Sequence, residues 1–184
     1  YNTNRTVPDR RCRASVTLRN QGGIMTYTLI DSTVLGSAAS SVTFSGISAT
    51  GKGDLVLVTN IQPPASSVTQ AYLRFNSDTG SNYSLVGMYG NGSSAGSYTA
   101  TATSLSLSYY GSVGSGGSFL GITHIMDFAE SKHKTVLSRI GSSPVAAEAG
   151  RWANTAAITS LEIFKSGQDF AAGSSFYLYQ IVSE

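Results

Sequence analysis

The sequence has little charge, one cysteine and no long apolar run. Charged residues make up 12% of its 184 residues, about half the usual share of soluble proteins. Cys12 is the only cysteine, which excludes an intrachain disulfide and a zinc site built from paired cysteines. No run reaches the roughly 18 apolar residues that a membrane-spanning helix needs, so we expect no membrane partner. Stability is therefore expected to come from packing or assembly.

Glycine, serine, threonine and tyrosine are abundant instead. Ten tyrosines stand against one tryptophan. Tyrosine suits half-buried strand faces and binding surfaces, because it combines an apolar ring with a polar tip. Low charge with many hydroxyl groups is typical of β-proteins whose outward strand residues are serine and threonine.

Positive charge is concentrated at the start of the chain. Residues 1–23 have a net charge of +4, five arginines minus Asp9, and the remainder has a net charge of −2. We expect 1–23 to be an extended basic arm, followed by a single domain at 24–184. The arm either docks on an acidic surface or is a solvated tail, and both alternatives stay open. Because the sequence begins at Tyr1 rather than methionine, we also expect processing or a preceding region. The five arginines are Arg5, Arg10, Arg11, Arg13 and Arg19.

Short alternating or apolar segments recur about every ten residues, without a long amphipathic helix pattern. This spacing predicts eight to ten strands and an all-β fold, an antiparallel β-sandwich of jelly-roll type. The predicted strands are 25–30, 41–47, 54–61, 69–76, 82–89, 97–110, 119–128, 135–140 and 175–182, with further apolar residues between 152 and 164.

Three segments need a finer interpretation. Both faces of 54–61 are apolar, which indicates a central strand that is covered on both sides. In 97–110 the alternation changes phase near Thr103, which indicates a bulge or two strands joined by a bend. Residues 141–150, which contain Pro144, are predicted to be a loop, with a short helical turn at 145–149 as the one alternative.

The segment 73–94 reads as a β-hairpin followed by a second reversal at Gly90-Asn91-Gly92. The first turn has polar residues at alternate positions, as at the start of a calcium loop. A bidentate glutamate is required twelve positions from the first ligand, and Gly87 stands there, so the EF-hand interpretation fails. A looser ligand or calcium site and a turn held by its own Asx side chains both remain open. The candidate ligand-binding residues are Asn76, Asp78 and Asn82.

No catalytic pattern stands out. A Gly-x-Ser-x-Gly motif is absent, and most carboxylates lie at strand ends or turns, where aspartate is a common turn residue. His124 shares a strand face with Leu120 and Ile122, and we interpret it as a packed, hydrogen-bonded histidine. We therefore expect a protein that is not an enzyme, without catalytic residues, metal or cofactor.

Several motifs resemble a domain of virion structural proteins of tailed bacteriophages. The matching segments are LRFNSDTGSNYS at 73–84, YGNGSS at 89–94, IMDFAESKHKTV at 125–136, RWANTAAITSLEI at 151–163 and DFAAGSSFYLYQI at 169–181. Together they cover roughly residue 41 to the C-terminus, and the arm lies outside the match. The resemblance implies a jelly-roll β-sandwich with a structural or attachment role, and it brings no catalytic residues.

Taken together, these features predict a structural component of a phage particle, either a capsid decoration, cement or head-fibre protein anchored by its arm or a tail-associated protein. Its partners would be other virion proteins and further copies of itself, a trimer by fold analogy. The alternative is a carbohydrate-binding module for host attachment, which recognises a cell-surface glycan. Tyrosines, Trp152 and the Asn/Asp/Gly turns favour that alternative. Arginines without interleaved aromatics do not indicate nucleic acid.

Overall fold

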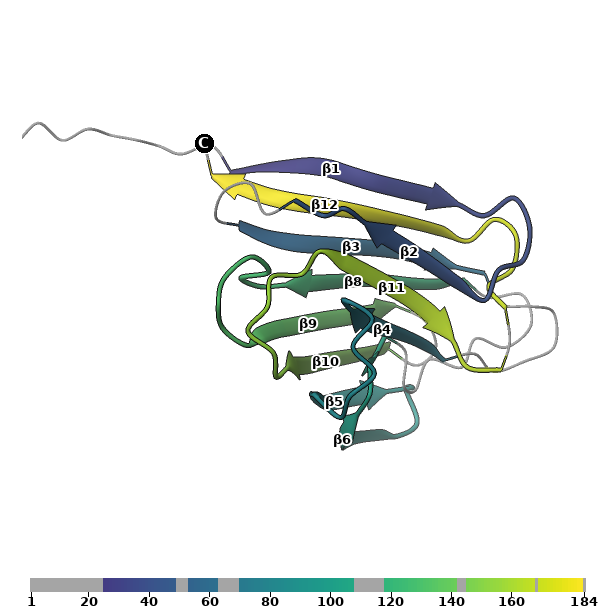
Figure 1. Ribbon diagram of the computed structural model, residues 1–184. Coiled ribbons are helices and arrows are strands. Elements are labelled where there is room, and N and C mark those ends of the chain that lie inside the picture. Colours follow the sequence, from purple (N-terminus) through teal and green to yellow (C-terminus); the bar gives the residue numbers. More distant parts are fainter. Residues whose placement is uncertain are drawn as a thin grey trace, which may run out of the picture.

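The protein is all-β and consists of two antiparallel sheets, as predicted (Figure 1). The structure is a computed structural model that describes residues 25–48, 53–62, 70–107, 118–141, 145–167 and 169–183. The predicted arm at 1–23, with its five arginines, lies outside the described residues. No helix long and apolar enough to cross a membrane occurs in the described ranges. The jelly-roll type stays a prediction.

The larger sheet has eight strands, and strands far apart in the sequence are neighbours in it. In spatial order they are β1 (Met25–Val34), β12 (Ser175–Ser183), β3 (Gly53–Ile61), β8 (Phe119–Ile125), β9 (Lys134–Gly141), β10 (Val145–Trp152), β5 (Tyr83–Gly90) and β6 (Ala95–Ala102). The register of β1 on β12 shifts between Leu29 and Asp31, which marks a bulge.

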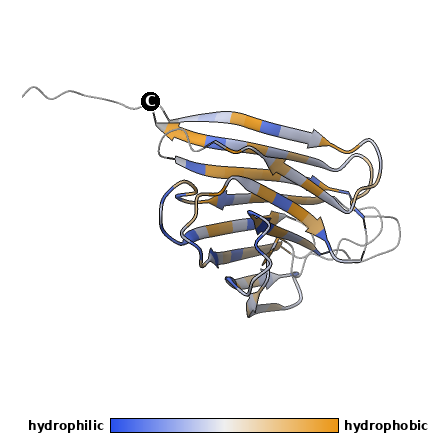
Figure 2. Cartoon of the chain, viewed as in Figure 1, coloured by the Kyte–Doolittle hydropathy of each residue, from blue (hydrophilic) through white to orange (hydrophobic). Residues whose placement is uncertain are grey.

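The smaller sheet lies over one face of the larger one (Figure 1). In spatial order its strands are β2 (Ser41–Ser45), β11 (Ser160–Lys165), β4 (Ala71–Phe75) and β7 (Leu105–Ser106). Hydrophobic residues recur along the strands of both sheets (Figure 2).

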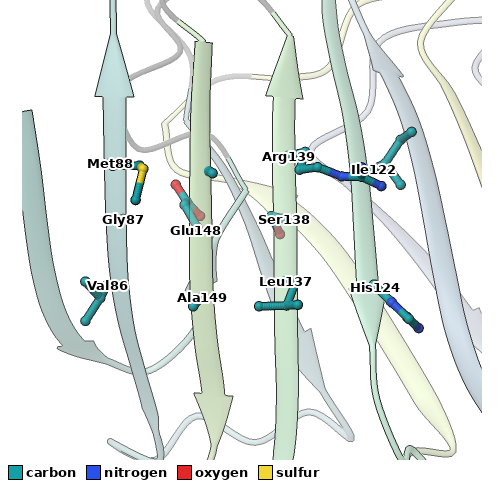
Figure 3. A pocket seen from close by; sticks show the side chains of 11 residues that line it. Val86, Gly87, Met88, Ile122, His124, Leu137, Ser138, Arg139, Glu148 and Ala149 are labelled. Carbon is teal, nitrogen blue, oxygen red and sulfur yellow. The ribbon is translucent and has the colours of Figure 1, made fainter. Parts of the chain in front are cut away.

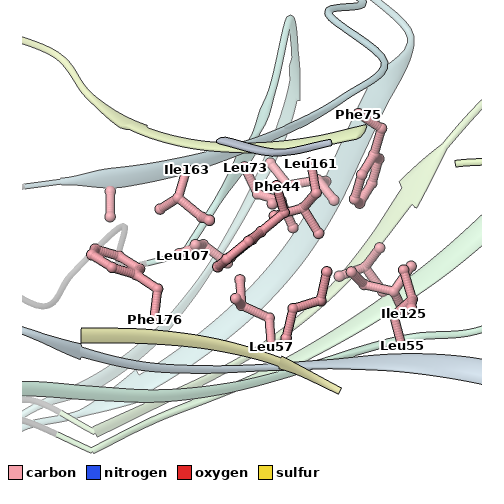
Figure 4. Close-up of a cluster of buried hydrophobic side chains, with 14 of the residues drawn as sticks. Phe44, Leu55, Leu57, Leu73, Phe75, Leu107, Ile125, Leu161, Ile163 and Phe176 are labelled. Carbon is pink, nitrogen blue, oxygen red and sulfur yellow. The ribbon is translucent and has the colours of Figure 1, made fainter. Parts of the chain in front are cut away.

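The hydrophobic core fills the space between the two sheets. Alternate residues of most strands point into it, as the period of two requires, whereas β1 contributes no buried residue among its described side chains. Phe44, Leu73 and Ile163 from the small sheet contact this core, and Leu55 and Leu57 of β3 lie on its other side (Figure 4). At one end Trp152 packs against two aromatic rings, with centroid distances of 5.4 Å to Phe75 and 6.3 Å to Tyr83.

The change of phase near Thr103 marks the crossing between the two sheets. β6 belongs to the larger sheet and β7 to the smaller one, so the prediction of two strands joined by a bend is confirmed. β3 is central, also as predicted. Val56, on the side turned away from the smaller sheet, is buried and Val58 is half-buried. The described strands form no layer over that side, and cover on both sides stays a prediction.

Two other local predictions are wrong. β4 and β5 do not form a hairpin, because the turn between them passes from the smaller sheet to the larger one. The only hairpin of that segment is β5–β6, around the Gly-Asn-Gly reversal. Residues 145–152, predicted as a loop or helical turn, form β10 between β9 and β5. Alanine and glycine at this strand weaken the alternation that identifies a strand.

Candidate functional site

The predicted ligand turn at 76–82 is held by its own side chains. Asn76 and Ser77 have φ angles of 50° and 55°, a left-handed conformation that asparagine tolerates better than most residues. The side-chain amide of Asn76 donates to the carbonyl of Ala157 at 2.7 Å, and its oxygen accepts the backbone amides of Thr159 and Ser160 at 2.9 and 3.1 Å. Asn76 thus fixes the segment that leads into β11.

Asp78 binds in the opposite direction, toward the core. Its carboxylate accepts the indole N–H of Trp152 at 2.7 Å, the side-chain amide of Asn82 at 2.9 and 3.1 Å and the backbone amide of Gly80 at 2.9 Å. The pKa of Asp78 is lowered from its usual value, chiefly by the bond from Trp152, with further bonds from Asn82 and Gly80 outweighing partial burial. This charge satisfies the only polar group of the buried tryptophan.

The structure therefore brings Asp78 and Asn82 together and directs Asn76 elsewhere. The alternative of a turn held by Asx side chains accounts for all of these contacts. Gly87, where a calcium loop would need glutamate, lies within β5, and a Cβ atom there would be 2.4 Å from the ring of Tyr98. Ligand binding at the turn stays a prediction, but the side chains of Asn76, Asp78 and Asn82 already form hydrogen bonds within the protein.

The outer face of the eight-stranded sheet is the most unusual surface of the molecule. We define it as the face turned away from the smaller sheet. All exposed large hydrophobic side chains of the described residues belong to this sheet, and Met88 and Val86 are 65% and 59% exposed. Soluble monomers rarely expose a contiguous apolar area of this extent, which usually marks an interaction site.

Strand register aligns outward side chains of this face, several of them large and exposed, in two neighbouring rows across the sheet. The first row contains Leu29, Tyr179, Val56, His124, Leu137, Ala149 and Val86. The second contains Ser32, Tyr177, Val58, Ile122, Arg139, Ala147 and Met88. Because facing residues of adjacent strands point to the same side, each row is a continuous band of contacts.

A groove of about 480 Å³ lies on this face along β10 (Figure 3). Ala147 and Ala149 form its floor, because their side chains end at Cβ. Met88 and Val86 of β5 border one side, and β9 and β8 border the other. Arg139 extends toward Ile122 on the neighbouring strand (Figure 3). The larger sheet is therefore hollowed where its residues are smallest, and the hollow is lined mainly by apolar groups.

His124 lies on the same face and forms a hydrogen bond with a carboxylate. Its Nε2 is 2.9 Å from Oδ2 of Asp54, and both side chains are about one-third exposed. The other carboxylate oxygen of Asp54 accepts the backbone amide of Asp127 at 2.8 Å. The predicted hydrogen bond of His124 is thus present, with Asp54 at the start of β3 as its partner.

The described residues contain no group of three or more His, Cys, Asp or Glu side chains that could hold a metal ion. Two lysines instead lie between the sheets: Lys134 donates to the carbonyls of Glu130 and Lys132, and Lys165 donates to that of Asp169, each at 2.6 Å. Burial lowers the pKa of both, that of Lys165 to about 8. Their ammonium groups bind backbone oxygen atoms and connect the ends of loops to the core.

Sequence reasoning missed the groove because it missed β10. The segment does contain a weak alternation with a period of two. Its outward residues are Val145, Ala147 and Ala149, and its inward residues are Ala146, Glu148 and Gly150. Most of these side chains are small, so neither face of the segment appears apolar on its own. Only the neighbouring strands show that small outward residues beside large ones form a hollow.

The comparisons with known proteins bring no match. No family model, curated protein or solved structure matches the chain. The resemblance to phage virion proteins accordingly stays a prediction.

Proposed function

We propose that the protein is a non-enzymatic structural component of a phage virion, a jelly-roll capsid decoration, cement or head-fibre protein. One observation carries the proposal: an apolar outer face spans the larger sheet and includes a groove floored by alanine. Such a face is suited to association with another protein surface. The resemblance of four separated patches to virion proteins indicates the proposed location, a virion outside the cell.

Two different surfaces would then make contacts in the assembled particle. The basic arm at 1–23, with Arg5, Arg10, Arg11, Arg13 and Arg19, would anchor the domain on the particle through its net charge of +4. The outer face would pack against a protein neighbour. An arm on an acidic capsid surface forms a salt-sensitive contact, whereas packing of apolar strands resists salt.

Particle occupancy tests the anchoring role. We expect deletion of 1–23 to abolish incorporation, while replacement of the five arginines by glutamine, which keeps the length, reduces it and removes its salt sensitivity. The measurement is the copy number per particle by quantitative gel or mass spectrometry. Undiminished occupancy of both variants would exclude anchoring by the arm. Absence of the intact chain from purified particles would exclude the virion role.

The alternative is a tail-associated carbohydrate-binding module for host attachment. Tyr27, Tyr177 and Tyr179 lie close together on the outer face, and Tyr27 is 63% exposed. Tyrosine rings of this kind can stack on sugars. Trp152 no longer supports this alternative, because its side chain is fully buried. Specific binding on a glycan array that is lost in Tyr27→Ala, and retained in Tyr72→Phe as a control in the smaller sheet, would establish it over the capsid role.

A further inference from the structure

We propose that the outer face pairs with the same face of a second copy of this chain, about a two-fold axis that runs parallel to the strands between β3 and β8. The inference rests on the proposed assembly role of the outer face and names its partner. Its support comes from the relief of the face, its register, its charges and its area.

The two halves of the outer face have opposite relief. On β1 and β12 most outward side chains are large, Ser32 being an exception, and we call the large ones the ridge: Tyr27, Leu29, Tyr177 and Tyr179. In the middle of β10 the outward side chains are Ala147 and Ala149, at the floor of the groove, with Val145 and Arg151 outward at the two ends of the strand. The middle strands β3 and β8 carry Val56, Val58 and Ile122, which are of intermediate size. A surface with a ridge and a matching groove on either side of its centre can bind a copy of itself.

The strand order aligns these halves. An axis between β3 and β8 places β12 of one copy opposite β9 of the other, and β1 opposite β10, because the sheet order is β1-β12-β3-β8-β9-β10. Within the first row Leu29 then faces Ala149, and Tyr179 faces Leu137. By symmetry Leu29 of each copy enters the groove of the other, so this contact occurs twice per pair. Packed sheets usually cross at an angle of about 30°. This rotation also brings each side chain into contact with neighbours of the residue that it faces, but the order of the facing strands stays the same.

The charges of the face permit this pairing. In the second row Arg139 lies opposite Tyr177 of the other copy, whose ring can receive the guanidinium group. The two Arg139 side chains lie on opposite sides of the axis, three strand spacings or about 14 Å apart, which exceeds the screening length of about 10 Å at 0.1 M salt. Asp54, the carboxylate at one edge of this face, is already paired with His124 within the copy.

The area is sufficient for a stable pair. Six overlapping strands, each about seven residues long, cover roughly 670 Å² per copy at ordinary strand dimensions. The pair therefore buries about 1,300 Å² in total, within the range of about 1,200–2,000 Å² for specific interfaces. Face-to-face packing of two copies uses this surface in both of them, so a trimer would need another surface. The segment 1–23 is a poor occupant, because its net charge of +4 would be repelled by Arg139 and Arg151.

The test is the mass of the full-length protein in solution, measured by sedimentation velocity over a range of concentrations. We expect a dimer for the wild type, and monomers for Leu29→Arg and for Ala149→Asp. Both positions are exposed, so both variants should fold, as circular dichroism can verify. Ala95→Arg is the control, because β6 lies outside the six overlapping strands, and it should remain dimeric.

Mixing the two monomeric variants tests the geometry. In the mixed pair the arginine introduced by Leu29→Arg in one copy faces the aspartate introduced by Ala149→Asp in the other, while the second ridge and groove keep their wild-type residues. We expect a dimer to return in the mixture alone. A monomeric or trimeric wild type, or a mixture that stays monomeric, would overturn the proposal. A dimer that is absent from virions would overturn the proposed function and leave this inference standing.

Discussion

The interior of the sandwich is mostly hydrophobic but holds a few hydrogen-bonded charged side chains, whereas the outer face of the larger sheet exposes large apolar ones. Between the sheets lie the charged side chains of Lys134, Lys165 and, at one end, Asp78, each with hydrogen-bond partners. On the outer face Val86 and Met88 are more than half exposed. Polar groups are satisfied inside the protein, and apolar groups remain available to a partner.

This contrast changes where a binding site should be sought. A search for polar clusters in the sequence leads to the turn at 76–82, whose groups are used to connect elements. The outer face has few such groups, yet its side chains are exposed. Removing an internal polar contact should therefore lower the free energy of unfolding, whereas changing the outer face should alter association. Three predictions test this difference, in order of decreasing effect.

The largest effect is expected for Asp78→Ala. The substitution leaves the buried indole N–H of Trp152 without an acceptor and removes two bonds from Asn82. We expect the free energy of unfolding to fall by about 3 kcal/mol, since hydrogen bonds to charged groups and unsatisfied buried donors each contribute about 1–3 kcal/mol. Chemical denaturation at pH 7 measures this loss. Asp31→Ala on the exposed edge strand is the control and should change the free energy of unfolding by less than about 0.5 kcal/mol. An equal loss in both variants would contradict the stabilising role of the Asp78 hydrogen bonds.

A smaller effect is expected from the titration of Lys165. Burial lowers the pKa of its ammonium group to about 8, below the usual 10.5, so between these values the unfolded chain binds more protons than the folded one. Stability should therefore rise with pH from about 8 upward. Solvent screening reduces the gain to about 1–2 kcal/mol from the full value of about 1.4 kcal/mol per pKa unit.

Lys165→Met should remove this rise, which thermal denaturation between pH 7 and 9.5 would show. Lys134 has a pKa lowered by burial and contributes with the same sign, so the difference between wild type and variant isolates Lys165. Burial raises the pKa of Tyr83 to about 12, which makes stability fall above pH 10, outside the measured window. An unchanged slope in the variant would show that Lys165 does not titrate in this range.

The smallest effect on stability is expected for Ile122→Thr on the outer face. Its side chain is already 43% exposed, so the free energy of unfolding of the dilute protein should change by about 0.5 kcal/mol or less. The same substitution at Ile163, which is fully buried, should cost about 2–3 kcal/mol. Urea denaturation at one low protein concentration compares the two. Similar losses would show that the outer face belongs to the packed interior.

Most strand positions could be predicted from the sequence, because alternation in segments such as 119–125 reflects one buried face. β10 could not, since alanine and glycine give little contrast between its faces. The predicted hairpin between β4 and β5 was wrong for another reason. A turn sequence shows that the chain reverses, whereas the contacts of Asn76 with residues 157–160 and of Asp78 with Trp152 decide into which sheet it returns. Those contacts join residues about 80 positions apart and have no local signature.

The placement of the last two strands has a consequence for biosynthesis. β12 lies between β1 and β3 in the larger sheet, and β11 lies between β2 and β4 in the smaller one. β1 and β2 therefore have no sheet to join until β12 and β11 have left the ribosome. Because such pairings join distant parts of the chain, folding is slow compared with that of proteins rich in local contacts. β1 and β2 must therefore wait for these two late strands, and in that interval their unpaired edges are exposed to aggregation.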